Sequence, residues 1–181
     1  MSRLDPLARD KMDPDFARYY EELARAGGRS QGPYIAYMRN PALFKLNQAL
    51  SDCIRASSLT PVERQLAVLV TIRHFNARYA WCVQTRASLT AGMTREMIDA
   101  INDRKRPDMT QASEIAIWEV ADSLAGKRTL DDAIYARALA ALGEQRLIDL
   151  VATIGFFSMT GTTLRAFEME PPEDDQIPLK P

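Results

Sequence analysis

Few side chains in this sequence could carry acid–base chemistry. His74 is the only histidine, and it follows Arg73 near the end of an apolar stretch. Its unperturbed pKa is the only one here that suits proton transfer near neutral pH, so His74 is a catalytic candidate. A histidine near a helix C-terminus also interacts favourably with the helix dipole, so a purely structural role stays open. Arg73 could hold a substrate carboxylate through two hydrogen bonds, or it could pair with a nearby acidic residue.

The sequence offers two thiols and no recognisable cofactor motif. Cys53 and Cys82 are far apart and form no CxxC pair, which favours free thiols in a reducing compartment. We interpret Cys53 as a small buried apolar residue. There is no Gly-rich phosphate loop, no Ser/His/Asp arrangement and no His/Cys spacing typical of a metal site, so we expect no metal and no cofactor.

A helical hairpin at 60–92 must position these residues. Thr60, Pro61 and Glu63 are typical of a helix start with a capping box. The following LAVLVTI run is apolar on every side, and such a helix belongs in the interior of a protein. A turn at Asn76 and a second helix ended by Gly92 complete the pattern. The sequence therefore predicts an antiparallel helical hairpin whose first arm is central.

The rest of the chain is predicted to be helical as well, with no strand pattern and no linker. We expect an N-terminal arm at 1–13, one all-α domain at 14–170 and an acidic, proline-rich tail at 171–181. The tail is expected to be extended or disordered, or to strap onto a neighbouring subunit. Helices are predicted at 14–26, 33–38, 41–56, 94–102, 110–125, 130–142 and 144–168. Two finer expectations are an apolar stripe on the third helix, and close helix packing at two glycines of the last helix; the residues concerned are Leu43, Phe44, Leu46, Leu50, Ile54, Gly155 and Gly161.

Composition excludes several partners. The chain has 181 residues, with 23 Lys and Arg against 24 Asp and Glu, so no basic surface points to nucleic acid or an anionic membrane. Its apolar runs are too short to span a bilayer, and the N-terminus lacks the apolar core of a secretory signal. We expect a cytoplasmic protein with a small-molecule ligand.

A set of segments also carries a family resemblance between about residues 32 and 170. In order, these segments read GPYIAYMRNP, RQLAVL, RHFNARYAW, RASLTAGMT, YARALAALGEQRLIDLVATIGFF and TLRAFEME. The chain resembles the carboxymuconolactone decarboxylase-like family of the alkylhydroperoxidase D (AhpD)-like superfamily. This resemblance implies an AhpD-like helical bundle built around the central hairpin. It also implies a homo-oligomer that assembles through the hairpin region, with a trimer or hexamer favoured over a dimer.

The resemblance locates the family's site at positions where this chain lacks the family's cysteine, glutamate and histidine side chains. The CxxC of the AhpD-like members aligns with Ala77 and Ala80, so a dithiol peroxidase mechanism has no chemical basis here. The decarboxylase-like branch commonly carries E-W-x-x-H on the second arm and a glutamate on the first. These positions are Ala80, Gln84 and Gln65, and Trp81 is retained. Glutamine forms hydrogen bonds but cannot shuttle a proton near neutral pH.

Two functional hypotheses follow from the resemblance. The first is a decarboxylase-like lyase acting on a small acidic or lactone-type molecule, in which Gln65 and Gln84 hold the substrate or an oxyanion. The second is a non-catalytic relative that binds a small polar ligand or serves in assembly. In both, Gln65 is expected to bond to Gln84, a water or a ligand, because a buried amide without partners costs about 1–3 kcal/mol. The residues expected around the ligand are Trp81, Ala80, Arg73, Tyr79 and Cys82.

Overall fold

The central hairpin forms within the bounds that its end signals predict. In a computed structural model, which describes residues 2–171 and 177–181, α4 spans Pro61–Phe75 and α5 spans Arg78–Ala91. The Thr60 side chain accepts the backbone N–H of Glu63, and the Glu63 carboxylate accepts the backbone N–H of Thr60. Asn76 and Gly92 end the two helices in the left-handed region, with φ of 48° and 103°. The capping box and the left-handed end residues thus fix both arms.

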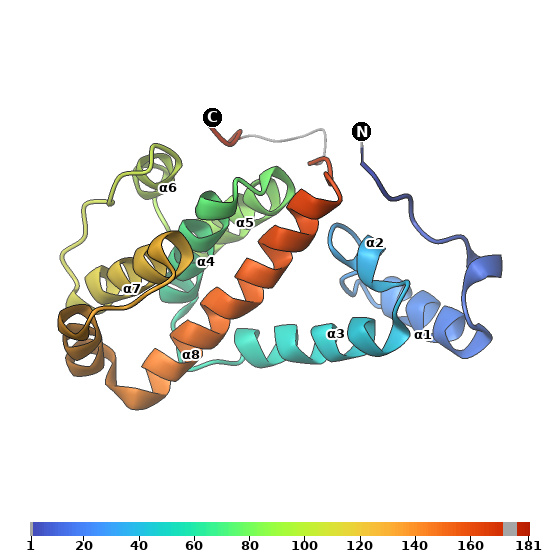
Figure 1. Cartoon of the computed structure of the whole chain (residues 1–181), viewed down its shortest axis with the longest axis horizontal. Coiled ribbons are helices and arrows are strands. Elements are labelled where there is room, and N and C mark those ends of the chain that lie inside the picture. The colour runs from blue at the N-terminus through green and yellow to red at the C-terminus, as the bar shows by residue number, and fades with distance from the viewer. Residues whose placement is uncertain (1, 172–176) are drawn as a thin grey trace.

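No strand occurs in the described part of the chain, which confirms the all-α prediction. The molecule is elongated, with α1 and α2 at one end and α7 and the start of α8 at the other (Figure 1). A short 3₁₀ turn, η1, precedes α1, and a π-helical turn, η2, extends α7. The remaining bounds are η1 Arg9–Lys11, α1 Pro14–Arg25, α2 Tyr34–Tyr37, α3 Pro41–Arg55, α6 Arg95–Asn102, α7 Ala112–Asp122, η2 Ser123–Lys127 and α8 Asp132–Ala166.

The last two predicted helices form one kinked element, α8. Gly143 has non-helical angles, with φ of 74° and ψ of 169°, and joins the two segments. The first segment starts two residues later than predicted, because Asp131 rather than Thr129 is the N-cap. By length and composition α8 is the one described helix that could span a bilayer, but core helices of soluble proteins pass the same test. In this structure α8 packs against α4 and α7.

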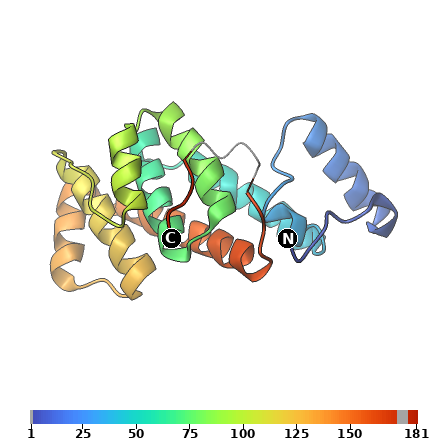
Figure 2. The same cartoon turned by 90° about the horizontal axis from the view of Figure 1, so that it is seen from above.

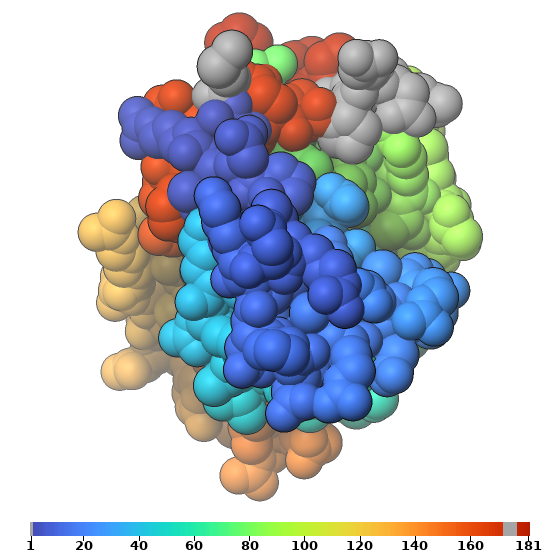
Figure 3. Space-filling model, turned by 90° about the vertical axis from the view of Figure 1, so that its right-hand side faces the viewer, coloured from blue at the N-terminus to red at the C-terminus, as the bar shows by residue number. Residues whose placement is uncertain are grey.

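The core has two parts. The larger surrounds α4, which packs against α5, α7 and α8, and its most buried side chains include Leu66, Leu69 and Ile72. A second, aromatic cluster joins α1, α2 and α3, where the Phe16 and Phe44 rings meet edge to face at 5.3 Å. The N-terminal arm and α1 form the end of the molecule beyond α3 (Figure 3). α3 therefore links the aromatic cluster to the main bundle.

The predicted inward stripe of α3 is wrong. Phe44 and Ile54 are buried, but the three leucines of the stripe, Leu43, Leu46 and Leu50, are 37–69% exposed. Three polar residues face inward in their place, namely Asn47, Gln48 and Ser51. The interpretation of Cys53 as buried is wrong for the same reason, because Cys53 continues the exposed leucine row. The predicted stripe therefore combined two faces of α3, with Phe44 and Ile54 on the inward face and the leucines on the outward face.

The C-terminal residues 177–181 pack on their own chain rather than extending away. Ile177 is buried, and the C-terminus lies over α5 when the molecule is seen from above (Figure 2). The Asn102 side chain donates to the main-chain oxygen of Pro178 and accepts the backbone N–H of Lys180, both at 2.9 Å. For this part the expectation of disorder is wrong, because the segment is held by side chains of its own chain; the alternative of a strap onto a neighbouring subunit stays a prediction. The remainder of the predicted tail, 172–176, lies outside the described residues.

Candidate functional site

A cavity of about 770 Å³ lies beside the central hairpin. Its walls come from α4, α5, the C-terminal turn of α3, the second segment of α8 and the loop before α2. The lining side chains are mostly apolar or amide-bearing, and three arginines join them. They are Gly28, Arg29, Ser30, Gln31, Pro33, Tyr34, Ser51, Ile54, Arg55, Pro61, Arg64, Gln65, Val68, Tyr79, Ala80, Val83, Gln84, Ala87, Thr90, Ala91, Phe156, Phe157, Thr160 and Leu164.

Antiparallel packing of the hairpin gives the cavity a gradient of polarity. On α4 the lining residues are Pro61, Arg64, Gln65 and Val68, so from Arg64 onward charge gives way to amide and then to apolar surface. α5 runs the other way and sets Gln84 opposite the middle of this series. Gly92, at the end of α5, lies near Val62 of α4, which fixes that register. The cavity is therefore charged at one end and apolar at the other.

Gln65 and Gln84 both line the cavity, from facing helices. The buried hydroxyl of Ser88 lies 3.3 Å from Gln65 Oε1 and 2.7 Å from the main-chain oxygen of Gln84. A hydroxyl group has one hydrogen to donate, so Ser88 forms its stronger hydrogen bond with the nearer acceptor, the main-chain oxygen of Gln84. The expected direct bond between the two amide groups is not found in the described structure. Both amides thus keep donors and acceptors for a ligand.

Tyr79 lines the cavity on the side of the α2 loop. Gly32 packs against its ring, and a Cβ at Gly32 would lie 2.3 Å from Tyr79 Cε1. Gly32 also has φ of 62°, so glycine is required there by both backbone and space. Burial raises the pKa of the Tyr79 hydroxyl, and the nearby Cys82 raises it further. Tyr79 therefore remains a protonated donor across the neutral range.

The three lining arginines differ in their partners. Arg29 pairs with Asp52 at 2.6 Å and donates to the main-chain oxygen of Gln48. Burial would lower its pKa, but hydrogen bonds with Asp52 and Tyr34 outweigh burial and raise it. Arg55 and Arg64 form no ion pair with any carboxylate in the described part of the chain. In the described lining there is also no carboxylate, histidine or cysteine, so the charged end of the cavity is positive.

His74 lies away from this cavity. Its Nε2 atom is 2.9 Å from Asp122 Oδ1 on α7, and a Cβ at Gly126 would lie 2.7 Å from its ring. A small pocket of about 30 Å³ beside it is too small for an organic ligand. His74 therefore ties α4 to the end of α7, and the structure does not bring it together with Gln65 and Gln84.

Arg73 and Trp81, both expected at the ligand, contact the C-terminal segment instead. Arg73 donates to the main-chain oxygens of Asn102 and Pro181, at 3.0 and 3.1 Å, and also bonds to the Asn76 side chain. The Trp81 indole N–H donates to the main-chain oxygen of Ile177. Trp81 is not part of the cavity lining to which Ala80 belongs, because its indole packs toward the C-terminal segment.

Neither cysteine lines the cavity. Cys82 is 1% exposed, and Arg86 Nη2 lies 3.4 Å from its sulfur. Cys53 is exposed on α3, and the two form no disulfide. Of the eight residues expected at the site, four therefore line the cavity, and these are Gln65, Tyr79, Ala80 and Gln84.

Sequence reasoning missed the arginines and the aromatic wall. Arg55 and Arg64 could have been found from the sequence, because they lie in the terminal turns of two helices joined by one short loop. Phe156 and Phe157 carry none, since any apolar run in α8 would look the same. Their rings meet edge to face at 5.2 Å and close the apolar end.

Comparison with known proteins shows the fold. No protein-family model matches the chain, and no curated protein does. Among solved structures, an AhpD-core, peroxidase-related protein from Ralstonia eutropha matches with a TM-score of 0.77 at 16% identity, over 98% of this chain and 97% of that one. A peroxidase-related protein from a Silicibacter species gives 0.79 at 17%, over 99% and 96%. The debrominase Bmp8 gives 0.72 at 18%, over 93% and 91%, and a variant of it was solved with 2,3,4-tribromopyrrole.

Proposed function

We propose that this chain, which has the AhpD-like all-α fold, is a small-molecule-binding protein that works without a proton relay. The observation that carries the proposal is the pair Gln65 and Gln84, which line one cavity from facing helices. No carboxylate, histidine or cysteine accompanies them in the described lining. The cavity volume is within the usual range for ligand sites, which is about 300–1,000 Å³.

The available groups suit recognition by hydrogen bonds. Each glutamine amide both donates and accepts, and neither titrates near neutral pH. The Tyr79 hydroxyl adds a donor that stays protonated, because burial raises its pKa. Ligand binding should therefore be independent of pH between about 5 and 9, where no residue of this set changes charge.

The names of the similar proteins raise the question of peroxidase activity, and a thiol-based peroxidase is not supported by this cavity. Two are described as peroxidase-related, and the third is a debrominase. A peroxide-reducing thiol must reach its substrate as a thiolate. Here Cys82 is buried outside the cavity lining and Cys53 lies on the outer face of α3. The likeness is at most 18% identical, so we carry over the fold and not the activity.

A decarboxylase-like lyase acting on a small acidic or lactone-type molecule is the second candidate. It is favoured by the two amides, whose N–H groups could stabilise an oxyanion that develops between them. Tyr79 would be the remaining hydrogen-bond donor. His74 would have no direct part, because it is paired with Asp122 outside the cavity.

The deciding experiment begins with native mass spectrometry of the purified protein, to identify a co-purified small molecule. Its affinity and any turnover are then measured from pH 5 to 9 in wild type, Gln84→Ala and His74→Gln. We expect a flat profile, an affinity loss of about tenfold in Gln84→Ala from one lost hydrogen bond, and no change in His74→Gln.

Two results would redirect the proposal. Turnover with a flat profile, lost in Gln84→Ala, would favour the lyase. A pH dependence that only His74→Gln removes would overturn the cavity as the working site, since His74 lies outside the cavity.

A further inference from the structure

Two arginines in direct contact, Arg55 and Arg64, line the charged end of the cavity. Arg55 is the last residue of α3, and Arg64 lies in the first turns of α4 after a short loop. Arg64 Nη1 donates to the main-chain oxygen of Arg55 at 3.2 Å, which fixes the two residues against each other. Both line the cavity, whereas their neighbour Arg29 is neutralised by Asp52.

This arrangement carries unbalanced positive charge. Half-burial lowers the pKa of Arg64, and the charge of Arg55 lowers it further. Two like charges close together destabilise each other, and an anion between them removes that repulsion. A guanidinium has five N–H donors, and Arg64 uses one of them on the Arg55 main-chain oxygen. The remaining donors match the two oxygens of a carboxylate.

The opposite end of the cavity is shaped for a flat apolar group. Phe156 and Phe157 stand edge to face, with their planes at 82°. Val68 from α4 and Leu164 from α8 also line the wall. Aromatic rings packed this way present both an edge and a face to a third ring. Between the two ends lie the glutamine amides.

We propose that the ligand of this cavity is an aromatic carboxylate, with its carboxylate held by Arg55 and Arg64 and its ring between Phe156, Phe157 and Val68. The assignment rests on the proposed function, since it names the class of molecule that the same cavity binds. The order of charge, amides and apolar wall along α4 sets the orientation of the ligand.

A structural role for the arginines is the competing explanation. Cations at a helix C-terminus interact favourably with the helix dipole, and Arg64 caps one carbonyl of α3. This role predicts an effect of Arg64 on stability and none on ligand choice. It also gives no reason for both guanidinium groups to line the cavity.

The test compares two probes of one shape, naphthalene-2-carboxylate and its neutral carboxamide, by isothermal titration calorimetry at pH 7. We expect wild type to bind the carboxylate at least tenfold more tightly, and we expect this preference to weaken with added salt. Arg55→Gln and Arg64→Gln should each reduce the preference severalfold. Arg18→Gln, on the exposed surface of α1, removes the same charge elsewhere and should leave it unchanged.

The outcomes of this experiment distinguish a failure of the anion assignment from a failure of the proposed ligand-binding function. Equal binding of both probes in wild type, lost for both in the cavity-filling variant Ala87→Phe, would overturn the anion assignment and still support the cavity. A carboxylate preference that survives in both arginine variants would overturn the role of the pair. Binding of neither probe at millimolar concentration would overturn the aromatic carboxylate class. Arg55 is exposed, so Arg55→Gln should fold even if Arg64→Gln does not.

Discussion

The indole N–H of Trp81 donates a hydrogen bond to the main-chain oxygen of Ile177 at 2.9 Å, and both residues are buried. This contact joins the central hairpin to the last residues of the chain. Asn102 and Arg73 hold the same segment through its main chain. Trp81, which the resemblance associates with the family's site, therefore acts here as an anchor for the C-terminal segment.

Trp81→Phe should lower the free energy of unfolding by about 1–3 kcal/mol, because it leaves the buried Ile177 oxygen without its donor. Urea unfolding measures this loss, and hydrogen exchange should show faster opening at 177–181. In a chain that ends at Pro171 the same substitution should cost less, since its partner is absent. An equal cost in both backgrounds would mean that Trp81 acts through packing alone.

Two glycines of α8 make a matched pair for the packing of α8 on α4. A Cβ at Gly161 would lie 2.8 Å from Phe75 Cβ, whereas one at Gly155 would meet nothing within 4 Å. Gly161→Ala should therefore destabilise the protein by about 1–3 kcal/mol through overpacking. Gly155→Ala should stabilise it by about 0.5–1 kcal/mol through helix propensity. Thermal unfolding of the two variants measures these stability changes. Equal changes in both variants would contradict the close helix contact at Gly161.

These glycines also show what the sequence could predict. Capping residues are local signals, so the bounds of α4 and α5 could be predicted from Thr60, Asn76 and Gly92. Whether a glycine permits a helix contact depends on the neighbouring helix, so Gly161 fits the expectation of close packing and Gly155 does not.

The same distinction applies to the site. Gln65 and Gln84 could be placed on one cavity because the family resemblance locates a site at these two positions of the hairpin. The structural roles of His74, Arg73 and Trp81 could not be predicted. Their hydrogen-bond partners, Asp122 and the C-terminal residues, are distant from them in sequence.

The Glu63–Arg146 pair should govern part of the acid stability. Burial would raise the pKa of Glu63, but hydrogen bonds from Arg146, the Thr60 backbone and Ser113 outweigh burial and lower it. A lowered carboxyl pKa contributes stability above the unfolded pKa of about 4.3, and that stability is lost as pH falls through the folded pKa. Glu63→Gln should therefore lose less stability than wild type between about pH 5 and 3, as measured by urea unfolding at each pH.

Arg146→Met tests the same pair at pH 7. It leaves Glu63, whose side chain is 7% exposed, without its cation, and should cost about 3 kcal/mol. Arg137→Met is the control, because Arg137 pairs with Glu119 while 55% exposed and should cost less than about 1 kcal/mol. Similar costs in the two variants would show that the buried pair contributes no more than a surface one.

The thiols should behave as packing and surface groups. A thiol reagent should modify exposed Cys53 in a folded monomer, and buried Cys82 only after unfolding. Replacing both with serine should leave ligand affinity in the cavity unchanged. Steady-state reduction of a hydroperoxide that disappears in Cys82→Ser would contradict this prediction.

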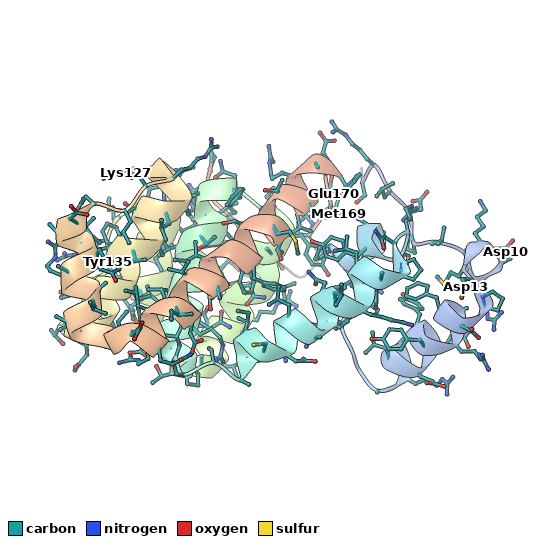
Figure 4. The ribbon with its side chains drawn as sticks, turned by 60° about the horizontal axis from the view of Figure 1, so that its bottom comes forward. Asp10, Asp13, Lys127, Tyr135, Met169 and Glu170 are labelled. Carbon is teal, nitrogen blue, oxygen red and sulfur yellow. The ribbon has the colours of Figure 1, made fainter. Side chains whose placement is uncertain are left out.

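The outward leucines of α3 lead to the last prediction, which concerns self-association. An amphipathic helix normally turns its apolar face to the core, yet Leu43, Leu46 and Leu50 are exposed while polar residues of α3 point inward. α8 contacts α3, and the two helices are seen together on the face of the molecule in Figure 4. α8 adds the exposed side chains Ile148 and Val151. Exposed apolar side chains gathered on two helices in contact are typical of a surface that binds another subunit.

We therefore expect a homo-oligomer that assembles through α3 and α8 rather than through the hairpin. Light scattering coupled to size exclusion should give a mass above that of one chain, and Leu46→Glu with Leu50→Glu should reduce it. Leu89→Glu, at a position on α5 whose exposure of 41% is close to the 44% of Leu50, should not reduce it. Cys53, in the same row of α3, should be protected from a thiol reagent in the oligomer and modified in the double variant. A monomer mass for wild type, or dissociation by Leu89→Glu alone, would contradict this interface.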